Sequence, residues 1–536
     1  MGRNITKLMI AATAGLCCAS ALAAPHATSN IPHSIPAIVA QAHKVGPHSP
    51  TGVMNIAIGL KLRNVDQLRQ FLQQVQDQAS PEYHHFLTPE QFTQRFGPTQ
   101  AQADAVAAFL ADSGIHVKDV SSNRLLVHAR GQVSVIEHAF GIAINDYQYG
   151  NRHFYAPAAN PQVPAAIAGT VQSVIGLSDA AILTPHWRSA PHKGKPGGGS
   201  TTPPGFSPQQ IATAYNWPSV TSTANGAGAT IAIATAYGFK SSDITGFWSQ
   251  YNLPNHTVQV VPIDGNTHRL EVETELDIQR SGAMAPGAAI LVYEGANAYL
   301  TTFTDAYNQI VVDNQADVMT TSWGLDETDT STATIQTDDA IFMQAAAQGI
   351  ALFAAAGDNG SSDGTSSSVA ADFPSSDPYV TAAGGTTLTL NSNGTIKSET
   401  AWSGAGGAES GYFPEPSWQT GTNVPEDGYR QTSDISMDAD PNTGYSVLTR
   451  GAWAVYGGTS FVAPELAGLF AVKVSQTGAR LGNANPLIYS DAGANYGTDF
   501  FDITSGSNGA FSAGAYWDHP TGWGSPNASN LLLHIQ

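Results

Sequence analysis

The sequence has almost no cysteine: Cys17 and Cys18 are the only two among 536 residues. Both lie in an N-terminal stretch with a basic start, an apolar segment from Leu8 to Leu22 and small residues after it, which is the pattern of a secretory signal peptide. We therefore predict a signal peptide over residues 1–24 and a secreted protein, extracellular or periplasmic in transit. Because both cysteines leave with the signal, the mature chain has no disulfide, no cysteine nucleophile and no Cys-ligated zinc.

Long apolar runs and basic residues are also scarce. The first apolar segment is short for a membrane span and has no later counterpart of about 18 residues, so we expect no transmembrane helix. The formal net charge is −20, and it is unevenly divided, with +4 over residues 1–203 and −24 over residues 204–536. So acidic a second part makes a nucleic-acid partner unexpected. We expect the two parts to attract each other near neutral pH, and less as carboxylates protonate.

Length and composition divide the chain near residue 200. A chain of 536 residues exceeds one typical core. Residues 25–185 show a mixed helix and strand pattern without a catalytic constellation, and residues 186–204, rich in Gly, Pro, Ser and Lys, predict an exposed linker open to processing. Residues 205–536 alternate strand-like and helix-like apolar runs. This alternation predicts an α/β fold with a doubly wound, mainly parallel sheet.

The segment Tyr456–Gly468 indicates a nucleophile at the start of a helix. Two glycines permit a tight turn, and the apolar run Phe461–Val472 predicts a buried helix whose Pro464 suits the first turn. Ser460 lies at the turn, where unpaired backbone N–H groups and the positive end of the helix can stabilise an oxyanion. An ordinary serine N-cap is the alternative.

The base for this serine is not a histidine of the subtilisin type, because no His-Gly-Thr-His segment follows residue 204. Instead, Glu273 and Asp277 are four residues apart, on one face of a predicted helix. Two carboxylates there repel each other, and a shared proton would explain the arrangement. The alternatives are a solvated acidic helix start and a metal-dependent hydrolase that also uses Glu271, although no nearby histidine completes a transition-metal site.

A third candidate is Asp358, which follows the buried strand-like run Ile350–Ala356 in a Gly-Asp-Asn-Gly turn. Open α/β sheets bind ligands at the carboxyl ends of their parallel strands, where this position is expected to lie. Aspartate is also common in such turns for purely local reasons.

Together these motifs resemble the sedolisin family of serine-carboxyl peptidases, and its kumamolisin-like members in particular. Three segments match in order: Glu273-x-x-x-Asp277, Gly357-Asp358-x-Gly360 and Gly458-Thr459-Ser460-x-x-x-Pro464. The resemblance implies a subtilisin-like catalytic domain over residues 205–536. It also implies an α+β, ferredoxin-like activation propeptide over residues 25–185 that inhibits the active site and assists folding.

The resemblance further implies a secreted, acid-active endopeptidase that is made as a self-activating zymogen and acts as a monomer on proteins. Ser460 would attack the scissile carbonyl to form an acyl-enzyme, Glu273 would take its proton, Asp277 would share that proton, and a protonated Asp358 would donate to the oxyanion. Because an unperturbed carboxyl group has a pKa of about 4, this last role favours acid. In one departure from the kumamolisin-like pattern, Thr235 replaces a carboxylate. A catalytically silent secreted binding protein on the same fold is the alternative function.

The resemblance also implies one structural Ca²⁺ ion near the C-terminus. Its ligands would be the carboxylates of Asp502 and Asp518 and the backbone carbonyls of Ile503, Gly514 and Tyr516. Hard oxygen ligands on two loops suit Ca²⁺, which takes about six to eight of them. Without the resemblance, two aspartates that cap turns would explain the same residues.

Overall fold

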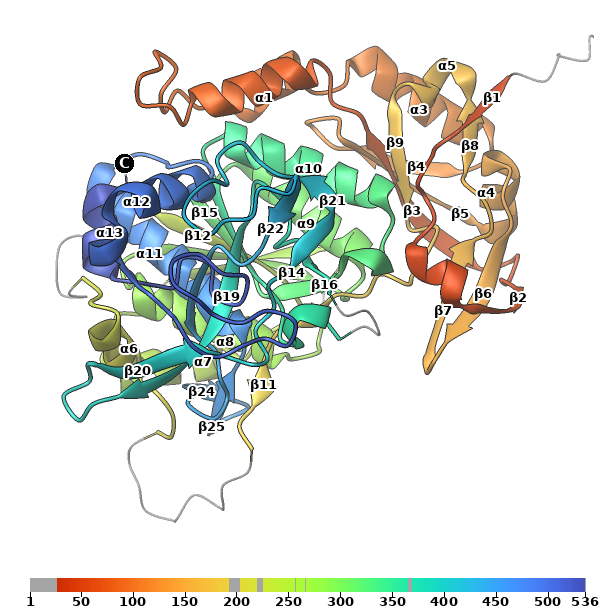
Figure 1. Ribbon diagram of the computed structural model, residues 1–536. Helices are drawn as coiled ribbons and strands as arrows, with labels where there is room; N and C mark the ends of the chain where they lie inside the picture. The colour runs from red at the N-terminus through yellow and green to blue at the C-terminus, as the bar shows by residue number, and fades with distance from the viewer. Residues whose placement is uncertain are drawn as a thin grey trace, which may run out of the picture.

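The computed structural model describes residues 27–191, 203–218, 225–255, 257–265, 267–364 and 369–535. They form an N-terminal domain and a larger C-terminal domain that lie against each other (Figure 1). The predicted signal peptide and most of the predicted linker lie outside the described residues. Within the described ranges, no helix combines the length and apolar character that crossing a bilayer requires.

The N-terminal domain is built on a four-stranded antiparallel sheet in the order β4-β5-β3-β9. Its elements follow the chain as β3 (Val53–Leu60), α3 (Gln100–Asp112), β4 (His116–Val120), β5 (Leu126–Gln132), α4 (Val133–Phe140) and β9 (Val171–Ile175). This is the βαββαβ order of a ferredoxin-like fold. Thr99 starts α3 with a capping box, since its side chain accepts from the backbone N–H of Gln102 and Gln102 reciprocates.

The C-terminal domain contains a sheet in the order β13-β14-β12-β15-β17-β19-β20, with β23 also paired to β19. All of these pairs are parallel except the one that joins β20 to β19. The strands are β12 (Thr230–Ala236), β13 (Val258–Ile263), β14 (Ala289–Gly295), β15 (Val318–Thr321), β17 (Ala351–Ala355), β19 (Thr381–Leu390), β20 (Ile396–Ala401) and β23 (Ile435–Asp438). The predicted doubly wound, mainly parallel sheet is confirmed.

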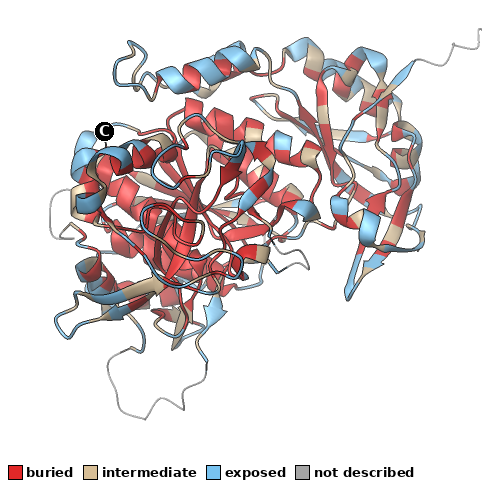
Figure 2. Cartoon of the chain, viewed as in Figure 1, coloured by how far each residue is buried: buried red, intermediate tan, exposed pale blue. Residues whose placement is uncertain are grey.

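Helices cover both faces of this sheet. The helices α8 (Val272–Met284) and α11 (Val462–Thr477) pack on one face, and α9 (Leu300–Asp313) and α10 (Thr332–Ala347) pack on the other. Strand β12 shows why: Ile231 and Ile233 join the core under α8 and α11, and the alternate residues Ala232 and Ala234 join the core under α9 and α10. Figure 2 shows the middle strands of the sheet, such as β12 and β17, almost continuously buried, whereas the edge strands β13 and β20 are mostly exposed or half-buried.

The N-terminal domain covers helix α10 of the C-terminal domain. The close approach of β3 requires Gly59, since a Cβ atom there would lie 2.4 Å from Oγ1 of Thr337. The helices α1 (Val65–Gln74) and α2 (Pro89–Arg95) extend over the far end of α10 and share an apolar cluster with Met343 and its neighbours. The interface therefore buries apolar surface that each domain would otherwise expose.

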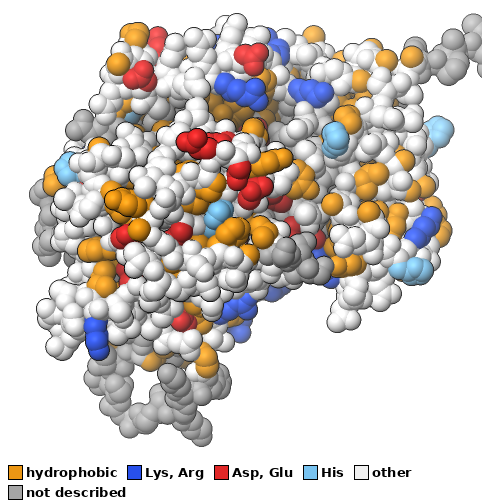
Figure 3. Space-filling model, in the orientation of Figure 1, with side chains coloured by type: hydrophobic (Ala, Val, Ile, Leu, Met, Phe, Trp, Pro, Cys, Tyr) orange, Lys and Arg blue, Asp and Glu red, His pale blue; other side chains and the backbone are white. Residues whose placement is uncertain are grey.

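Charged pairs border this interface. Arg152 of the N-terminal domain lies 2.7 Å from Asp329, and Nε2 of His128 lies 2.8 Å from Asp305 of α9. Burial lowers the pKa of His128, but Asp305 and Asp119 outweigh it and raise the pKa to about 9. The expected attraction thus has specific contacts at this boundary, and Figure 3 shows Lys and Arg side chains close to acidic ones on the face in view.

Candidate active site

The nucleophile candidate lies where the sequence predicts it, at the start of a buried helix. Ser460 is in the 3-10 turn η4 (Thr459–Phe461), directly before α11, and is fully buried. Its hydroxyl donates to Oε2 of Glu273 at 2.8 Å. The N-cap of α11 is Phe461, which makes no side-chain cap. Ser460 is therefore not an N-cap, and its hydroxyl is bonded to the carboxylate that could take its proton.

Glu273 and Asp277 both lie on the N-terminal half of α8 and are both completely buried. This excludes the solvated acidic face. Burial and then the charge of Asp277 raise the pKa of Glu273 well above its ordinary value. Burial also raises the pKa of Asp277, against the Ser322 hydroxyl, which donates to its Oδ1 at 2.6 Å. Two buried carboxyl groups with raised pKa values favour a pair that holds one proton between them.

Asp358 lies just past the carboxyl end of β17, as predicted. Its Oδ1 accepts from the backbone N–H of Thr459 at 2.8 Å and from the Thr459 hydroxyl at 3.0 Å. Its Oδ2 is buried and accepts no hydrogen bond from the described residues. Burial raises the pKa of Asp358 to about 6, against the opposing effects of His186, Thr459 and Arg188. A carboxyl group with this pKa is a neutral hydrogen-bond donor in mild acid.

A buried ion pair joins the two helices that carry these groups. The guanidinium of Arg280 on α8 donates to Oε1 of Glu465 on α11, and both side chains are completely buried. Arg280 also lies over the ring of Tyr445, 4.7 Å from its centroid, and that ring stacks on Phe461. The serine and its carboxylate partner are therefore held at a fixed separation by contacts behind them.

The first residues of the predicted linker pair with strands of the C-terminal domain beside Ser460, and among them Arg188 and Ser189 are exposed as predicted whereas His186 is buried. Strand β10 (Thr184–Pro185) pairs antiparallel with β16 (Trp323–Asp326). Strand β11 (Arg188–Ser189) pairs antiparallel with β25 (Ala452–Gly457). His186, between them, is 2% exposed. The linker composition gave no sign of this, because the pairing partners lie more than 130 residues away in the sequence.

The carbonyl of His186 faces the candidate nucleophile. The backbone N–H of Ser460 donates to the His186 oxygen at 3.0 Å, and the N–H of His186 donates to the Ser322 carbonyl at 3.0 Å. A Cβ atom placed on Gly458 would lie 2.2 Å from that oxygen and 2.5 Å from Oδ2 of Asp358, so both crowd the same glycine. The oxygen thus occupies the position where an oxyanion would form, between the Ser460 amide and Asp358.

Two hypotheses about the surroundings of Glu273 remain: Thr235 in place of a carboxylate, and Glu271 as a metal ligand. The hydroxyl of Thr235 is within 3.0 Å of the Thr274 hydroxyl and accepts from the indole N–H of Trp323 at 3.0 Å, and no hydrogen bond within the described residues joins it to Glu273. The side chain of Glu271 accepts a hydrogen bond from the backbone N–H of Val272, the first residue of α8, and forms an ion pair with Arg269. Among the described residues, Glu271, Glu273 and Asp277 do not gather their carboxylates as metal ligands would.

The predicted calcium ligands come together on two loops after α12 (Ala484–Asp499). Asp502 accepts from the backbone N–H of Tyr516 at 3.0 Å, and Asp518 accepts from the N–H of Gly514 at 2.9 Å. Burial and, to a smaller extent, the charge of Asp502 raise the pKa of Asp518 to about 6. No hydrogen bond within the described residues ends on the carbonyl of Ile503, Gly514 or Tyr516. Two neighbouring carboxylates and three unpaired carbonyls form a donor set that fits Ca²⁺.

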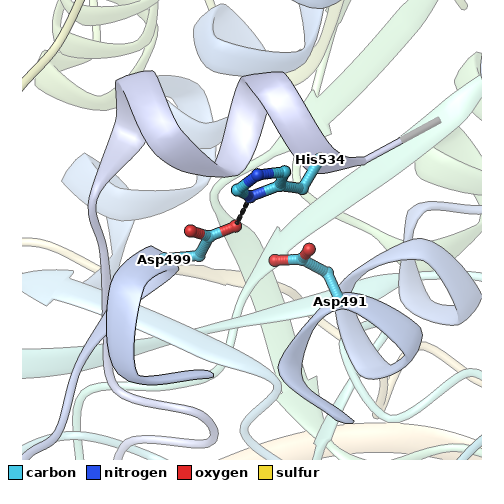
Figure 4. Close-up of side chains that lie close together, drawn as sticks. All are labelled: Asp491, Asp499 and His534. Atoms are coloured by element: carbon cyan, nitrogen blue, oxygen red, sulfur yellow. Dashed lines mark hydrogen bonds and ion pairs between the residues drawn. The ribbon is translucent and has the colours of Figure 1, made fainter. Parts of the chain in front are cut away.

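Another acidic group with a histidine lies near the C-terminus (Figure 4). The Nδ1 atom of His534 on α13 (Ala528–His534) lies 2.5 Å from Oδ2 of Asp499, and Asp491 lies close by on α12. Burial raises the pKa of Asp491 to about 6. Since the imidazole already pairs with Asp499, this group ties α13 to α12 and lies outside the cleft.

Comparisons with known proteins match both domains. The family described as "Pro-kumamolisin, activation domain" matches residues 40–180, and the family described as "Subtilase family" matches residues 253–485. Sedolisin of Pseudomonas sp. (strain 101) is 32% identical, over 90% of this chain and 87% of that protein. Kumamolisin of Bacillus sp. (strain MN-32) is 30% identical over 92% of this chain and 93% of its own. Mouse tripeptidyl-peptidase 1 is 26% identical over 91% of this chain.

A solved structure of Pseudomonas sedolisin, described as a serine-carboxyl proteinase complexed with two molecules of pseudo-iodotyrostatin, also matches. It is 32% identical with a TM-score of 0.57, and the match covers 62% of this chain and 98% of that one. A serine bonded to a glutamate on a subtilisin-like sheet, behind an activation domain, defines a serine-carboxyl peptidase zymogen. With 32% identity across most of both chains, this protein belongs to the sedolisin family.

Proposed function

We propose that this peptidase is a secreted, acid-active endopeptidase whose first substrate is its own chain. Ser460 attacks the scissile carbonyl and Glu273 takes the serine proton. Asp277 shares that proton with Glu273, and a protonated Asp358 donates to the oxyanion. The 2.8 Å hydrogen bond from Ser460 to Glu273 supports the first step, since it gives the nucleophile a base within reach.

The observation that carries the proposal is the seating of residues 184–190 in the cleft. The carbonyl of His186 accepts from the amide of Ser460, and the strands on either side of it pair with β16 and β25. A peptide substrate would bind in this way with the carbonyl of His186 as the scissile carbonyl, so that the bond between His186 and Trp187 is cut. Hence the processing site is the bond between His186 and Trp187, inside the predicted linker.

The length of the bound segment supports an endopeptidase. Ile182 bridges to Tyr299, and the N–H of Leu183 donates to the carbonyl of Ala298, four and three residues before His186. The chain thus continues past the third residue before the bond. A tripeptidyl-peptidase, which removes three residues from a free terminus, would need the cleft closed there.

The acid requirement follows from Asp358. A carboxylate beside the forming oxyanion would repel it, so the group must be neutral. Since burial raises its pKa to about 6, it becomes neutral below about pH 6 rather than only near pH 4. We therefore place the onset of processing near pH 6.

We further propose that Ca²⁺ binds at Asp502 and Asp518 with the carbonyls of Ile503, Gly514 and Tyr516. These loops follow α12 and lie apart from Ser460, so the ion would stabilise the fold and take no part in proton transfer.

The test uses the full chain and its Ser460→Ala variant, shifted from about pH 7 to about pH 4, on either side of the raised Asp358 pKa. We expect the wild-type chain to yield a fragment that starts at Trp187, by N-terminal sequencing, and then to digest a denatured protein. The variant should do neither while keeping its circular dichroism spectrum. An intact wild-type chain that also leaves the denatured protein undigested would refute the proposed function.

A further inference from the structure

The side chain of His186 fills a buried acidic pocket beside the cut bond. Its Nε2 atom lies 2.9 Å from Oδ2 of Asp372, which is on β18 (Asp372–Phe373) and completely buried. Neither Asp372 oxygen accepts a hydrogen bond from a backbone N–H or a hydroxyl of the described residues. A buried carboxyl group without such donors is costly unless something else meets it. The imidazole of His186 and the carboxyl group of Asp363 both lie against it here.

Two more carboxyl groups surround this contact. Asp326 is the direct cross-strand neighbour of Asp372 on β16, and Asp363 lies beside it. Burial and the charge of Asp372 raise the pKa of Asp363. Burial, and to a smaller extent the charge of Asp326, raises the pKa of Asp372. The nearest cation of the described segment is Arg188, which is occupied with the carbonyl of Asp358 and the side chain of Asn359. Within the described residues, acidic groups therefore outnumber basic ones around this pocket.

Gly324 gives this pocket its room. A Cβ atom at residue 324 would lie 2.0 Å from Oδ1 of Asp372 and 2.6 Å from Nε2 of His186. Any side chain there would separate the imidazole from the carboxylate. The pocket is thus shaped to bring a ring nitrogen against Asp372.

We propose that Asp372, assisted by Asp363, selects a basic side chain, histidine above all, at the residue before the cleaved bond. This inference rests on the proposed function and adds its substrate class: proteins that present an accessible basic residue. In acid a free imidazole is charged, since its unperturbed pKa is about 6.5. Burial lowers the pKa of the His186 imidazole in the pocket, while the charges of Asp358 and Asp363 oppose this effect. A protonated ring nitrogen within 2.9 Å of Asp372 can donate to its carboxyl group, and the bond is strongest when one partner is charged.

The test compares peptides with the sequence of residues 182–189 in which residue 186 is His, Lys, Gln or Leu. With processed enzyme at about pH 5, where free imidazole is charged, kcat/KM for the His peptide should exceed that for the Gln peptide by about tenfold to a hundredfold, the worth of one hydrogen bond between charged groups. Asp372→Asn should reduce this ratio to about threefold or less, a residual neutral hydrogen bond. Asp363→Asn, at a left-handed position that suits asparagine, should reduce it in part.

A matched control is Asp491→Asn, which removes another buried carboxyl group with a raised pKa, outside the cleft. It should keep the wild-type ratio. Equal rates for the His and Gln peptides in the wild type, or a ratio that Asp372→Asn leaves unchanged, would overturn the specificity while leaving the peptidase intact. Failure of the wild type to cut any peptide or denatured protein would overturn the proposed function and the specificity with it.

If Asp372→Asn does not fold, the full chain offers a second measurement. His186→Gln should slow the cut after residue 186, measured by the appearance of the Trp187 terminus. In the Asp363→Asn background the same change should slow the cut less, and this non-additivity reports the coupling of residue 186 to the acidic pocket. Strictly additive effects would contradict the proposal.

Discussion

The hydroxyl of Thr459 should set the upper pH limit of activity through Asp358. Thr459 donates twice to Oδ1 of Asp358, from its backbone N–H at 2.8 Å and from its hydroxyl at 3.0 Å. Both bonds stabilise the carboxylate and lower its pKa, while burial raises it to about 6. Thr459→Val removes the hydroxyl but keeps the N–H and the shape of the side chain. The pKa of Asp358 should rise, because the carboxylate loses a donor.

The sign and size of the effect follow directly. In the proposed mechanism activity requires the protonated form of Asp358, so a higher pKa would carry activity to higher pH, and the alkaline limb of kcat/KM should move upward. A hydrogen bond to a charged acceptor contributes about 1.5 kcal/mol, which corresponds to about one pKa unit. The hydroxyl also lies 3.2 Å from the carbonyl of Gly357, so it is shared and one unit is an upper value.

The assay is kcat/KM from about pH 4 to about pH 8, a range that spans the raised carboxyl pKa, on a peptide without titrating groups in that range. Thr459→Ser keeps the hydroxyl and should leave the limb in place. Asp358→Ala removes one oxyanion donor and should lower kcat by about 10²- to 10³-fold. The reasoning would be refuted if Thr459→Val shifts the alkaline limb to lower pH, or if Thr459→Val and Thr459→Ser have the same alkaline limb. Another group would then govern the upper pH limit.

Three further changes test other parts of the structure. Asp277→Asn should lower kcat by about 10²-fold or more, the usual worth of an acid–base group, and move the acidic limb to lower pH, because the charge of Asp277 raises the pKa of Glu273. His128→Gln removes the contact with Asp305 and should speed release of the N-terminal domain after the cut at about pH 6, below the raised His128 pKa, in a time course of size-exclusion chromatography against wild type. An unchanged rate of release would mean that this pair does not hold the domains together. Removing Ca²⁺ with EDTA should lower the melting temperature of an inactive variant by about 4 °C. A hundredfold excess of ion over Kd stabilises the folded state by about 2.7 kcal/mol, and the free energy of unfolding falls by about 0.7 kcal/mol per degree for some 330 residues. Asp502→Ala should abolish the difference that EDTA makes.

The sequence could predict the fold and the reacting groups because both leave local signals. The alternation of short apolar strands with helices predicts a doubly wound sheet, because strands that helices cover on both faces are apolar along their whole length. Glu273 and Asp277 stand out because two carboxylates on one helix face conflict with an otherwise apolar environment. Ser460 stands out because two glycines and Pro464 restrict the turn around it.

The rest depends on contacts between distant segments. Nothing near His186 in the sequence indicates that it pairs with the cleft, since the strands that hold it begin at Trp323 and Ala452. Asp372 becomes a pocket residue only when β18 lies beside β16. Arg280 left a weak signal, as a charged residue in a helix that is buried along its whole length, but its partner Glu465 cannot be identified without the packing of α8 on α11.

The strands on both sides of His186 have a consequence for the order of events in maturation. Each new chain end would remain paired after the bond is cut, β10 with β16 and β11 with β25, and the N-terminal domain would remain on its apolar cluster with α10. If the proposed cut occurs, cutting and activation would be separate events, and a nicked chain that still blocks its own active site would be an intermediate. The cut itself is unimolecular, so dilution should not slow it. Departure of the N-terminal piece is the step that frees the enzyme, and native size-exclusion chromatography of freshly nicked chains would find both pieces eluting together.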